Sequence, residues 1–317
     1  MIKKPLKPMF KWSGGKRREV PHVMELMPSR FDTFYEPFLG GGAVWLALAP
    51  SRSIVGDVLD EVIIFYKVLK EHGAVFVDDV NQFATEYCAL INANVQNTYG
   101  TDIAGTMAQL KQQKDNGQPP SPQLKIELKS LRAKARGEYK PCADLYYSWR
   151  DRECTSDYER AKRFYILRCL AYGGMLRYNA QGKFNIPYGY YKSFKQLKWD
   201  PRAAPLFANT HFMNESWQKC VATAQANDFV FLDPPYTRAF QDYAANGGFG
   251  PSDHEELAAW FKSKKTKAMI ILNKDDFTEK LYKEFIVKEY PFTYAVKYRD
   301  RLSKEDATTY HFVATNY

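Results

Sequence analysis

Residues 228–236 place the strongest constraint on the fold, because a buried strand has to end among them. The run from Phe229 to Leu232 is continuously apolar, as in strands that are buried on both faces of a parallel sheet. Asp233 and two prolines follow, and proline lacks the N–H group that a sheet needs. In open α/β sheets, ligands bind beyond the carboxyl ends of the strands. The pattern therefore predicts a strand that ends at a ligand site.

The residues after this strand suit a planar amine. The Asp233 carboxylate and the Pro234 carbonyl can both accept hydrogen bonds from one NH2 group. The ring of Tyr236 offers a face on which a flat ring can stack. The alternative is a strand end followed by an ordinary Pro-Pro turn, and other motifs have to decide between the two.

The size and composition of the chain describe a soluble globular protein. Its 317 residues allow one large domain with an insertion, or two domains. The formal net charge of +9 makes a polyanionic partner worth considering. We expect a cytosolic protein, because no apolar run reaches membrane-spanning length and residues 1–5 do not open a signal peptide. The five cysteines include no C-x-x-C pair, so neither a disulfide framework nor a zinc site is expected.

A glycine pair near the start of the chain lies in a basic and aromatic setting. Gly14 and Gly15 stand between Trp12 and Lys16, and seven Lys or Arg residues fall within residues 1–18. Glycine lets the backbone approach a ligand closely, so the segment is a candidate binding loop. It lacks the spacing of a Walker A loop, and a solvated basic arm is the alternative.

Residues 33–57 predict a strand, a glycine turn, a helix and a second strand. The strand at 33–39 meets three glycines at 40–42, and a helix of apolar composition follows at 43–48. Such a turn leaves the first helical N–H groups open to a ligand. The second strand ends in Asp57, where dinucleotide-type folds place the carboxylate that binds ribose hydroxyls. The alternative role for Asp57 is to cap the next helix, which we expect to end at Gly73.

From residue 74 to about residue 165 the alternation of strands and helices is lost, which indicates an inserted module. Ser121 and Pro122 predict the start of a helix with one leucine stripe. Its other faces carry Lys125, Lys129, Arg132, Lys134 and Arg136. This basic helix either is a solvated surface or binds phosphate groups.

Residues 172–192 predict a β-hairpin with its turn at 179–182. The tip carries side chains that can read base edges, stack on bases or bind phosphate, namely Arg177, Tyr178, Asn179, Gln181 and Lys183. A protein-binding surface is the alternative.

After Asp233 the alternation returns. We expect a helix opened by a capping box at 252–255, a buried strand at 267–273, a helix at 276–285 and two closing strands at 286–298 and 310–317. This arrangement places the chain in the α/β class.

Several motifs, taken together and in this order, resemble those of the Dam-type DNA adenine-N6 methyltransferases. They are FKWSGGK, YEPFLGGGAV, GD, LRYN with GKFNIPYGYYK, FLDPPY and HFVATNY. The resemblance implies a Rossmann-like α/β sheet, mostly parallel with an antiparallel last strand. It implies a discontinuous catalytic domain at 1–73 and 200–317, and a mainly helical target-recognition domain at 74–199 that bears the hairpin.

The resemblance also implies a reaction. S-adenosylmethionine would donate a methyl group to N6 of adenine in double-stranded DNA, and the base would have to be flipped out of the duplex. Neither a metal nor a covalent intermediate is implied. The implied setting is the cytoplasm of a bacterial or phage-infected cell, at the nucleoid. The oligomeric state and a partner restriction enzyme are left open.

Individual residues match the positions of the family's motifs. Those that would contact the cofactor are Trp12, Lys16, Glu36, Phe38, Gly40, Gly42, Asp57 and Asp233. Those that would hold the target adenine are Asp233, Pro234, Pro235 and Tyr236. The hairpin residues Arg177, Tyr178, Asn179, Gln181 and Lys183 would contact DNA, with Tyr178 as a wedge between base pairs.

The sequence also departs from the family's pattern. Gln181 stands where GATC-modifying relatives often carry a basic residue, the loop at 237–243 is short, and residues 97–141 look inserted. A GATC-like target is therefore only one option.

Three other functions are weighed against this one. Methylation of another planar amine, such as cytosine N4, an RNA adenine or a glutamine amide, is disfavoured by the hairpin and by the loop from Trp12 to Lys16. Asp233 and Asp57 argue against a non-catalytic DNA-binding regulator. A nicotinamide-dependent oxidoreductase would need an acid or base beside the glycine turn, and the sequence shows no evident one.

Overall fold

The computed structural model describes residues 5–94, 101–236, 249–263, 266–293 and 308–317. The chain divides into two compact units, one formed by Met1–Glu71 with Trp199–Tyr317 and the other by His72–Lys198. None of the described helices combines the length and the apolar character that crossing a bilayer requires.

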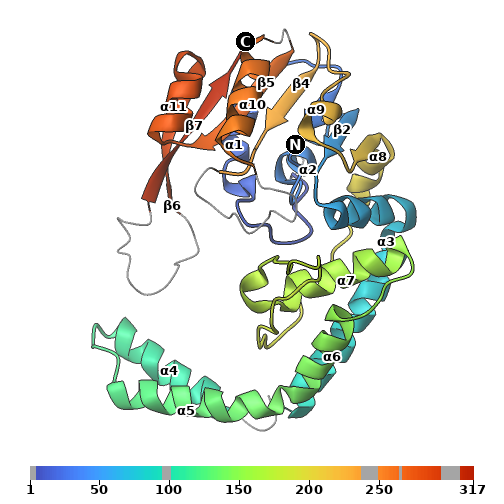
Figure 1. Ribbon diagram of the computed structural model, residues 1–317. Helices are drawn as coiled ribbons and strands as arrows, with labels where there is room; N and C mark the ends of the chain where they lie inside the picture. The colour runs from blue at the N-terminus through green and yellow to red at the C-terminus, as the bar shows by residue number, and fades with distance from the viewer. Residues whose placement is uncertain (1–4, 95–100, 237–248, 264–265, 294–307) are drawn as a thin grey trace. The chain divides into compact units, whose positions relative to one another are not determined.

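In its described residues the first unit contains a seven-stranded sheet with helices on its faces (Figure 1). The strands are β1 (Phe34–Glu36), β2 (Ser53–Gly56), β3 (Thr210–Met213), β4 (Phe229–Leu232), β5 (Lys267–Asn273), β6 (Ile286–Thr293) and β7 (Thr308–Thr315). The helices are η1 (Lys16–Arg18), α1 (Val20–Leu26), α2 (Ala43–Leu48), the start of α3 (Asp60–Ile91), η4 (Pro201–Ala203), α8 (Ala204–Ala208), α9 (Trp217–Cys220), α10 (Pro251–Ser263), α11 (Asp276–Tyr282) and η6 (Lys283–Phe285).

The strand order is β3-β2-β1-β4-β5-β7-β6. The neighbours from β3 to β5 are parallel, whereas β7 runs antiparallel to both β5 and β6. The predicted fold class, a mostly parallel sheet with an antiparallel last strand, is therefore confirmed. The strand order reverses between β1 and β4, and a crevice for ligands opens at such a point beyond the carboxyl ends of the strands. Glu36 ends β1 and Asp233 follows β4, so both flank this point.

The strand β4 is continuously apolar because helices cover both faces of the sheet. Val230 and Leu232 pack in one cluster with Leu257 and Phe261 of α10, and this cluster also includes residues of α9 and α11. Because side chains alternate along a strand, Phe229 and Phe231 face the other side. All four side chains of β4 are fully buried, and each such burial contributes about 1.5–3 kcal/mol.

The helix after β2 does not end at Gly73 as expected. It continues as α3 to Ile91, and Gly73 interrupts it with non-helical angles, φ 50° and ψ −122°. This positive φ is accessible to glycine at little cost. Gly73 is thus a kink, next to the boundary between Glu71 and His72 that separates the two units.

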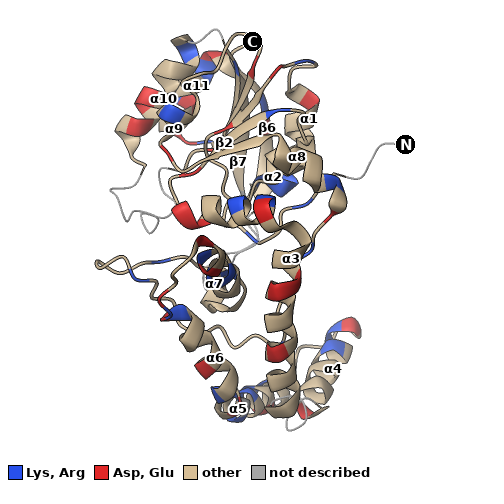
Figure 2. Ribbon diagram, turned by 90° about the vertical axis from the view of Figure 1, so that its right-hand side faces the viewer, with Lys and Arg blue, Asp and Glu red and all other residues tan. Residues whose placement is uncertain are grey.

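The second unit is mainly helical in its described residues. Besides the remainder of α3 it contains α4 (Thr101–Asp115), α5 (Pro122–Glu138), α6 (Lys140–Arg150), α7 (Asp157–Leu170) and η3 (Tyr172–Gly174). The predicted start of α5 is confirmed, because the Ser121 hydroxyl accepts a hydrogen bond from the Leu124 N–H at 3.4 Å. Figure 2 shows Lys and Arg residues along α5, and all five basic side chains named for this helix are exposed.

Buried tyrosines hold the irregular segment that follows α7. Tyr146 donates a hydrogen bond to the Ile186 carbonyl at 2.8 Å, and Tyr165 donates one to the Lys195 carbonyl at 3.0 Å. The hydroxyls of Tyr87 and Tyr188 bond to each other. A segment with few ladder hydrogen bonds thus satisfies its buried carbonyls with side-chain donors.

One local prediction near the end of the chain is wrong. The helix α10 begins at Pro251, so Ser252 is not its cap. Instead the Asp253 carboxylate accepts a hydrogen bond from the Gly250 N–H at 2.7 Å.

Candidate active site

The glycine turn between β1 and α2 lies directly under Trp12. Gly40 and Gly42 have φ angles of 46° and 61°, which glycine adopts at little cost. A Cβ atom on Gly40 would collide with the Trp12 indole nitrogen, and one on Gly41 would lie 2.8 Å from the Trp12 Cβ. The turn therefore needs glycine for contact as well as for conformation. The structure brings together two motifs that the sequence separates.

Glu36 sits at the carboxyl end of β1 with 3% of its surface exposed. Its Oε2 accepts a hydrogen bond from the Trp45 N–H at 2.8 Å, in the first turn of α2. A carboxylate is favourable there because it satisfies a free helical N–H. Burial and then the negative charges of Asp233 and Asp57 raise the pKa of Glu36 well above its usual value. The charges of Asp233 and Asp57 thus act on Glu36 at this edge of the sheet.

Asp57 connects the glycine turn to the next helix. Its Oδ2 accepts from the Gly40 N–H at 2.8 Å, and its Oδ1 accepts from the Leu59 N–H at 2.9 Å, just before α3. Burial raises the pKa of Asp57 although these backbone bonds oppose the shift. Leu59 precedes the first residue of α3, so this bond closes a turn before the helix, and a cap for α3 stays a prediction.

Asp233, which is half-buried, forms an ion pair with the buried Lys16. The Lys16 Nζ lies 2.6 Å from the Asp233 Oδ1 and 4.9 Å from the centroid of the Tyr236 ring. Burial raises the pKa of Asp233 to about 6, and the charge of Lys16 opposes this rise. Burial would lower the pKa of Lys16, but Asp233, Tyr236 and Glu19 raise it well above its usual value. The pair is therefore ionised near neutral pH, with the ammonium between a carboxylate and an aromatic ring.

The two prolines differ in their surroundings. Pro234 is buried, whereas Pro235 is exposed and its carbonyl accepts a hydrogen bond from the Nε2 of His254 in α10 at 3.0 Å. The His254 ring packs edge-on against Phe249, which packs edge-on against Phe38. The Pro-Pro arch is thus fixed from α10, and Phe38 lies in an aromatic wall.

Sequence reasoning missed the residues behind Lys16 and Tyr236. Glu19 follows η1, and its Oε2 lies 3.7 Å from the Lys16 Nζ. The His311 ring from β7 makes a T-shaped contact with the Tyr236 ring at 5.6 Å between centroids. The three-residue spacing of Lys16 and Glu19 was a usable signal for one pair. His311 stood in the HFVATNY motif without a role of its own, and no local pattern indicated a role at the site for His254.

The predicted recognition hairpin lies in the second unit. It is a tight turn with single bridge pairs, among them Tyr178 with Phe184. The Asn179 Oδ1 accepts from the Gln181 and Lys183 N–H groups at 3.0 and 2.9 Å, so this side chain holds the turn. Arg177, Gln181 and Lys183 are exposed at the tip, and Tyr178 is half-buried against Phe184.

The structure places the predicted residues in two groups. At the carboxyl edge of the sheet in the first unit are Trp12, Lys16, Glu36, Phe38, Gly40, Gly42, Asp57, Asp233, Pro234, Pro235 and Tyr236. In the second unit are Arg177, Tyr178, Asn179, Gln181 and Lys183. The short loop at 237–243 lies outside the described residues.

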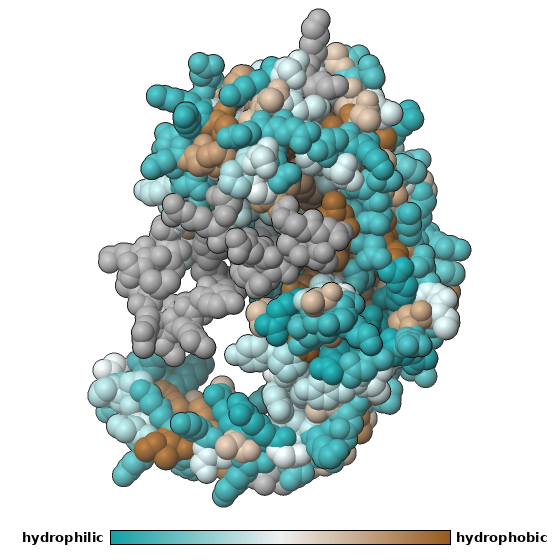
Figure 3. Space-filling model, viewed as in Figure 1, coloured by the Kyte–Doolittle hydropathy of each residue, from teal (hydrophilic) through white to brown (hydrophobic). Residues whose placement is uncertain are grey.

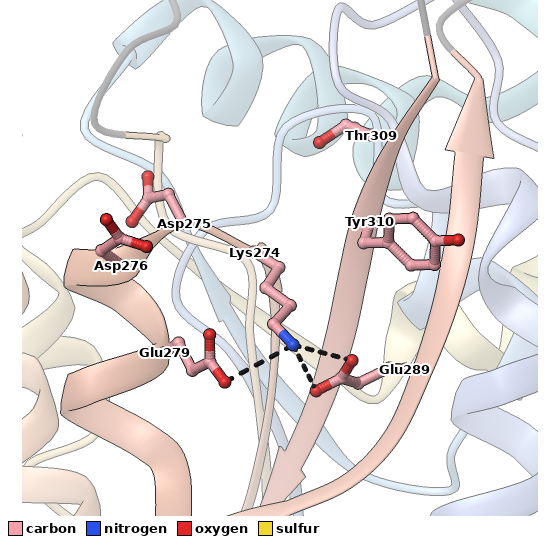
Figure 4. A pocket seen from close by; sticks show the side chains of 7 residues that line it. All are labelled: Lys274, Asp275, Asp276, Glu279, Glu289, Thr309 and Tyr310. Carbon is pink, nitrogen blue, oxygen red and sulfur yellow. Dashed lines mark hydrogen bonds and ion pairs between the residues drawn. The ribbon is translucent and has the colours of Figure 1, made fainter. Parts of the chain in front are cut away.

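A separate hollow of about 530 Å³ opens farther along the same edge, where β5 ends (Figure 4). Lys274 lies at its centre, with its Nζ 2.9 Å from both carboxylate oxygens of Glu289 and 3.4 Å from Glu279. Asp275 and Asp276 add further negative charge, and Thr309 and Tyr310 complete the lining. None of the predicted site residues lines it, and its negative lining does not suit phosphate. The ion pair of Lys16 and Asp233 is the better candidate site.

A family model and several known proteins match this chain. The family model described as D12 class N6 adenine-specific DNA methyltransferase matches residues 12–295. The Type II methyltransferase M1.LlaDCHI of Lactococcus lactis subsp. cremoris is 29% identical over 294 residues, covering 88% of this chain and 86% of that protein.

Two further relatives cover most of the chain. The Type II methyltransferase M.CviBI of Paramecium bursaria Chlorella virus NC1A is 28% identical over 317 residues, covering 98% of this chain and 100% of that protein. The DNA adenine methylase of Haemophilus influenzae is 25% identical over 291 residues, covering 87% and 82%. Because the family model spans most of the sequence, the chain belongs to the D12 class of N6 adenine-specific DNA methyltransferases.

Proposed function

We propose that this methyltransferase acts on an adenine that is flipped out of double-stranded DNA, with Asp233 and Tyr236 forming the pocket for the base. The observation that carries this proposal is the position of the Lys16 ammonium. It is an N–H donor 2.6 Å from the Asp233 carboxylate and 4.9 Å from the Tyr236 ring centroid. An adenine that stacks on Tyr236 presents its N6 amine to the same carboxylate.

The cofactor of the family, S-adenosylmethionine, fits the charges at the sheet edge. When bound it supplies an electrophilic methyl group on a positively charged sulfur. Glu36, Asp57 and Asp233 place three carboxylates near one another, and their mutual repulsion contributes to the raised pKa of Glu36. A cationic ligand relieves such repulsion. We assign the methionine part to the turn from Glu36 to Gly42, the ribose to Asp57, and further contacts to Trp12 and Lys16.

Asp233 prepares the amine for reaction. The lone pair of N6 is delocalised into the adenine ring, which makes the amine a poor nucleophile. Hydrogen bonds from its two N–H groups to the Asp233 carboxylate and the Pro234 carbonyl favour a pyramidal nitrogen with its lone pair free to attack. The gain comes from positioning and from preorganised acceptors. The Lys16 ammonium occupies the Asp233 Oδ1, so the amine has both carboxylate oxygens available only when this ion pair loosens.

The hairpin at 172–192 is proposed to contact the duplex. Arg177 and Lys183 are exposed cations that suit phosphates, and Gln181 is an exposed amide that suits base edges. Tyr178 is proposed as the wedge. Asn179 contributes by holding the turn, because its Oδ1 is bound to two backbone N–H groups.

A role in restriction and modification follows from two relatives that carry the name Type II methyltransferase. We propose that this chain likewise protects one DNA sequence, with a GATC-like site among the candidates. Modified plasmid should resist nucleases that cut at the protected sequence. Complete digestion of fully modified plasmid by such nucleases would contradict the protective role.

The test of the proposed function is methylation of random-sequence duplex DNA with labelled cofactor, followed by sequencing that detects modified bases. We expect N6-methyladenine at one short sequence. Asp233→Ala should lower turnover by about 10²–10³-fold, the loss typical of a removed preorganised group, while DNA binding persists. Label on cytosine would overturn the proposal, and near-normal turnover of Asp233→Ala would remove Asp233 from the mechanism.

A further inference from the structure

Glu19 is a buried carboxylate that the proposed chemistry does not use. It is 2% exposed and lies between η1 and α1. Its Oε1 accepts a hydrogen bond from the Tyr290 hydroxyl of β6 at 2.6 Å and lies 2.7 Å from the His311 Nδ1 of β7. Burying a carboxylate costs several kcal/mol unless partners compensate for it. Two other segments of the chain thus hold this carboxylate in place.

The second oxygen of Glu19 faces the active-site lysine. Its Oε2 lies 3.7 Å from the Lys16 Nζ, beyond hydrogen-bond length, whereas the Asp233 Oδ1 lies only 2.6 Å from the same nitrogen. Lys16 is 3% exposed, so its ammonium cannot turn to bulk water when it leaves Asp233. A shift of about 1 Å would give the Lys16 Nζ a charge-assisted hydrogen bond to Glu19 instead.

We propose that Glu19 is the positioning residue that receives the Lys16 ammonium when the target amine takes the Asp233 carboxylate. The inference rests on the proposed function. Without Asp233, the Lys16 Nζ would keep its hydrogen bond to the Gly14 carbonyl at 3.1 Å but would have no close carboxylate. A buried ammonium without a close counter-charge would oppose entry of the base, and Glu19 removes that cost by offering a second carboxylate. His311 and Tyr290 fix Glu19, and the His311 ring also packs against Tyr236. Lys16 therefore changes its partner beside the Tyr236 ring, on which the base is proposed to stack.

The charge of Glu19 is suited to this role. Burial would raise the pKa of Glu19, but the hydrogen bond from His311 and the charge of Lys16 lower it below its usual value. The carboxylate is ionised at neutral pH before the lysine moves towards it.

The test compares three variants with the wild type on a duplex that carries the target sequence found by the sequencing experiment. Glu19→Gln keeps the shape and removes the charge, and we expect its single-turnover methylation rate to fall by about tenfold or more. Its affinities for cofactor and for random-sequence duplex should stay within about twofold of wild type, because the exchange of partners is needed only when a base enters the pocket. The double variant Glu19→Gln with Lys16→Gln should be no slower than Lys16→Gln alone, because Glu19 acts through Lys16.

The matched control is Asp228→Asn. Asp228 is also a buried carboxylate, 5% exposed, and it lies at the opposite end of β4, where it accepts from the N–H groups of Thr33 and Gln225. We expect this variant to lose stability and to keep its rate per folded molecule. An equal loss of rate in Asp228→Asn, an unchanged rate in Glu19→Gln, or multiplicative losses in the double variant would each overturn the proposal.

A structure of the wild-type protein with target duplex and S-adenosylhomocysteine gives a readout that does not depend on the folding of any variant. Lys16 should then lie closer to Glu19 than to Asp233. A Lys16 that still contacts Asp233 beside a bound adenine would sink the inference. If the wild type methylates no adenine at all, the proposed function fails instead, and the two failures are distinguishable.

Discussion

Burial and the charge of Lys16 shift the pKa of Asp233 in opposite directions. Burial raises its pKa to about 6 and Lys16 opposes the rise. The ionised carboxylate of Asp233 accepts hydrogen bonds at both oxygens, whereas the protonated acid carries an O–H donor on one of them. We therefore predict that the methylation rate falls as the pH drops through about 6. Initial rates between pH 5 and 8 with labelled cofactor measure this limb.

The position of this limb also tests Lys16. Replacing Lys16 by Gln removes the charge that lowers the pKa of Asp233, so the acid limb should move to higher pH. Lys262→Gln is the control, because Lys262 is exposed on α10. An unmoved limb in Lys16→Gln would show that Asp233 does not set the pH dependence.

Asp57 has a structural and a proposed functional role that substitution can separate. Asp57→Ala leaves the Gly40 and Leu59 N–H groups without their acceptor, which costs about 1–3 kcal/mol of stability. Asp57→Asn keeps one acceptor oxygen, so it should fold better and still bind the cofactor more weakly if the ribose role is correct. Calorimetric titration and thermal melting measure the two effects. Unaltered cofactor affinity in Asp57→Asn would reduce Asp57 to a structural cap.

The site residues that could be predicted from the sequence are those that belong to a local pattern. Glu36, Asp57 and Asp233 each stand at the end of a strand that the sequence shows. Glu19 and His311 could not be paired in this way, because 292 positions separate them and only the closing of the sheet brings them together. Their contact depends on the tertiary structure and leaves no local pattern in the sequence.

The hairpin is the element on which target discrimination is proposed to depend. The Tyr178 ring packs edge-on against Phe184 at 5.7 Å between centroids. We predict that Tyr178→Ala lowers the ratio of rates on target and random duplex by about tenfold, because a wedge contributes only where the base pair opens. Tyr172→Ala is the control, since Tyr172 is 59% exposed in the same segment. A ratio that does not change would argue against the wedge.

The helix α5 presents a basic stripe whose role the sequence left open. Lys125, Lys129 and Arg132 follow one face at helical spacing and are exposed. Figure 3 shows hydrophobic and hydrophilic residues together in the region of α4 and α5. If the stripe binds phosphates, replacing all three by Gln should reduce the slope of log affinity against log salt by about 0.9 for each phosphate that the protein no longer neutralises. The matched control replaces the exposed Lys262, Lys280 and Lys283 of the other unit. Equal slopes in the two triple variants would make the stripe a solvated face.

Helices and strands were predicted correctly where a local sequence pattern determines them. The predictions failed where packing against the rest of the protein determines the element or its end. The buried strand at 267–273 was predicted to the residue, because its inner residues from Ala268 to Leu272 are an unbroken apolar run. The strand β3 was missed because it is short, at the edge of the sheet, and alternates between buried and less buried positions. Gly73 was expected to end a helix, yet α3 continues beyond it because Phe76, Val80 and their neighbours bury a further apolar face.

At the scale of the whole molecule, the chain leaves one unit at Glu71 and returns to it at Trp199. The loss of strand and helix alternation predicted an inserted module in this region. The assignment of cofactor chemistry to the first unit and of DNA recognition to the second is still a proposal. It requires that the two ligands act on different parts of the chain.

Hydrogen exchange on the intact protein tests this division. S-adenosylhomocysteine should slow exchange at the Gly40 and Trp45 amides, because it stabilises the turn that Asp57 and Glu36 hold. Target duplex, added next, should slow exchange in residues 177–183. Random duplex should slow exchange in α5 less than target duplex does. It should leave exchange at Tyr178 close to the rate in the free protein, because the proposed wedge engages only at the target. Cofactor protection confined to the hairpin, or duplex protection confined to the glycine turn, would contradict the division, since each ligand would then report on the unit assigned to the other.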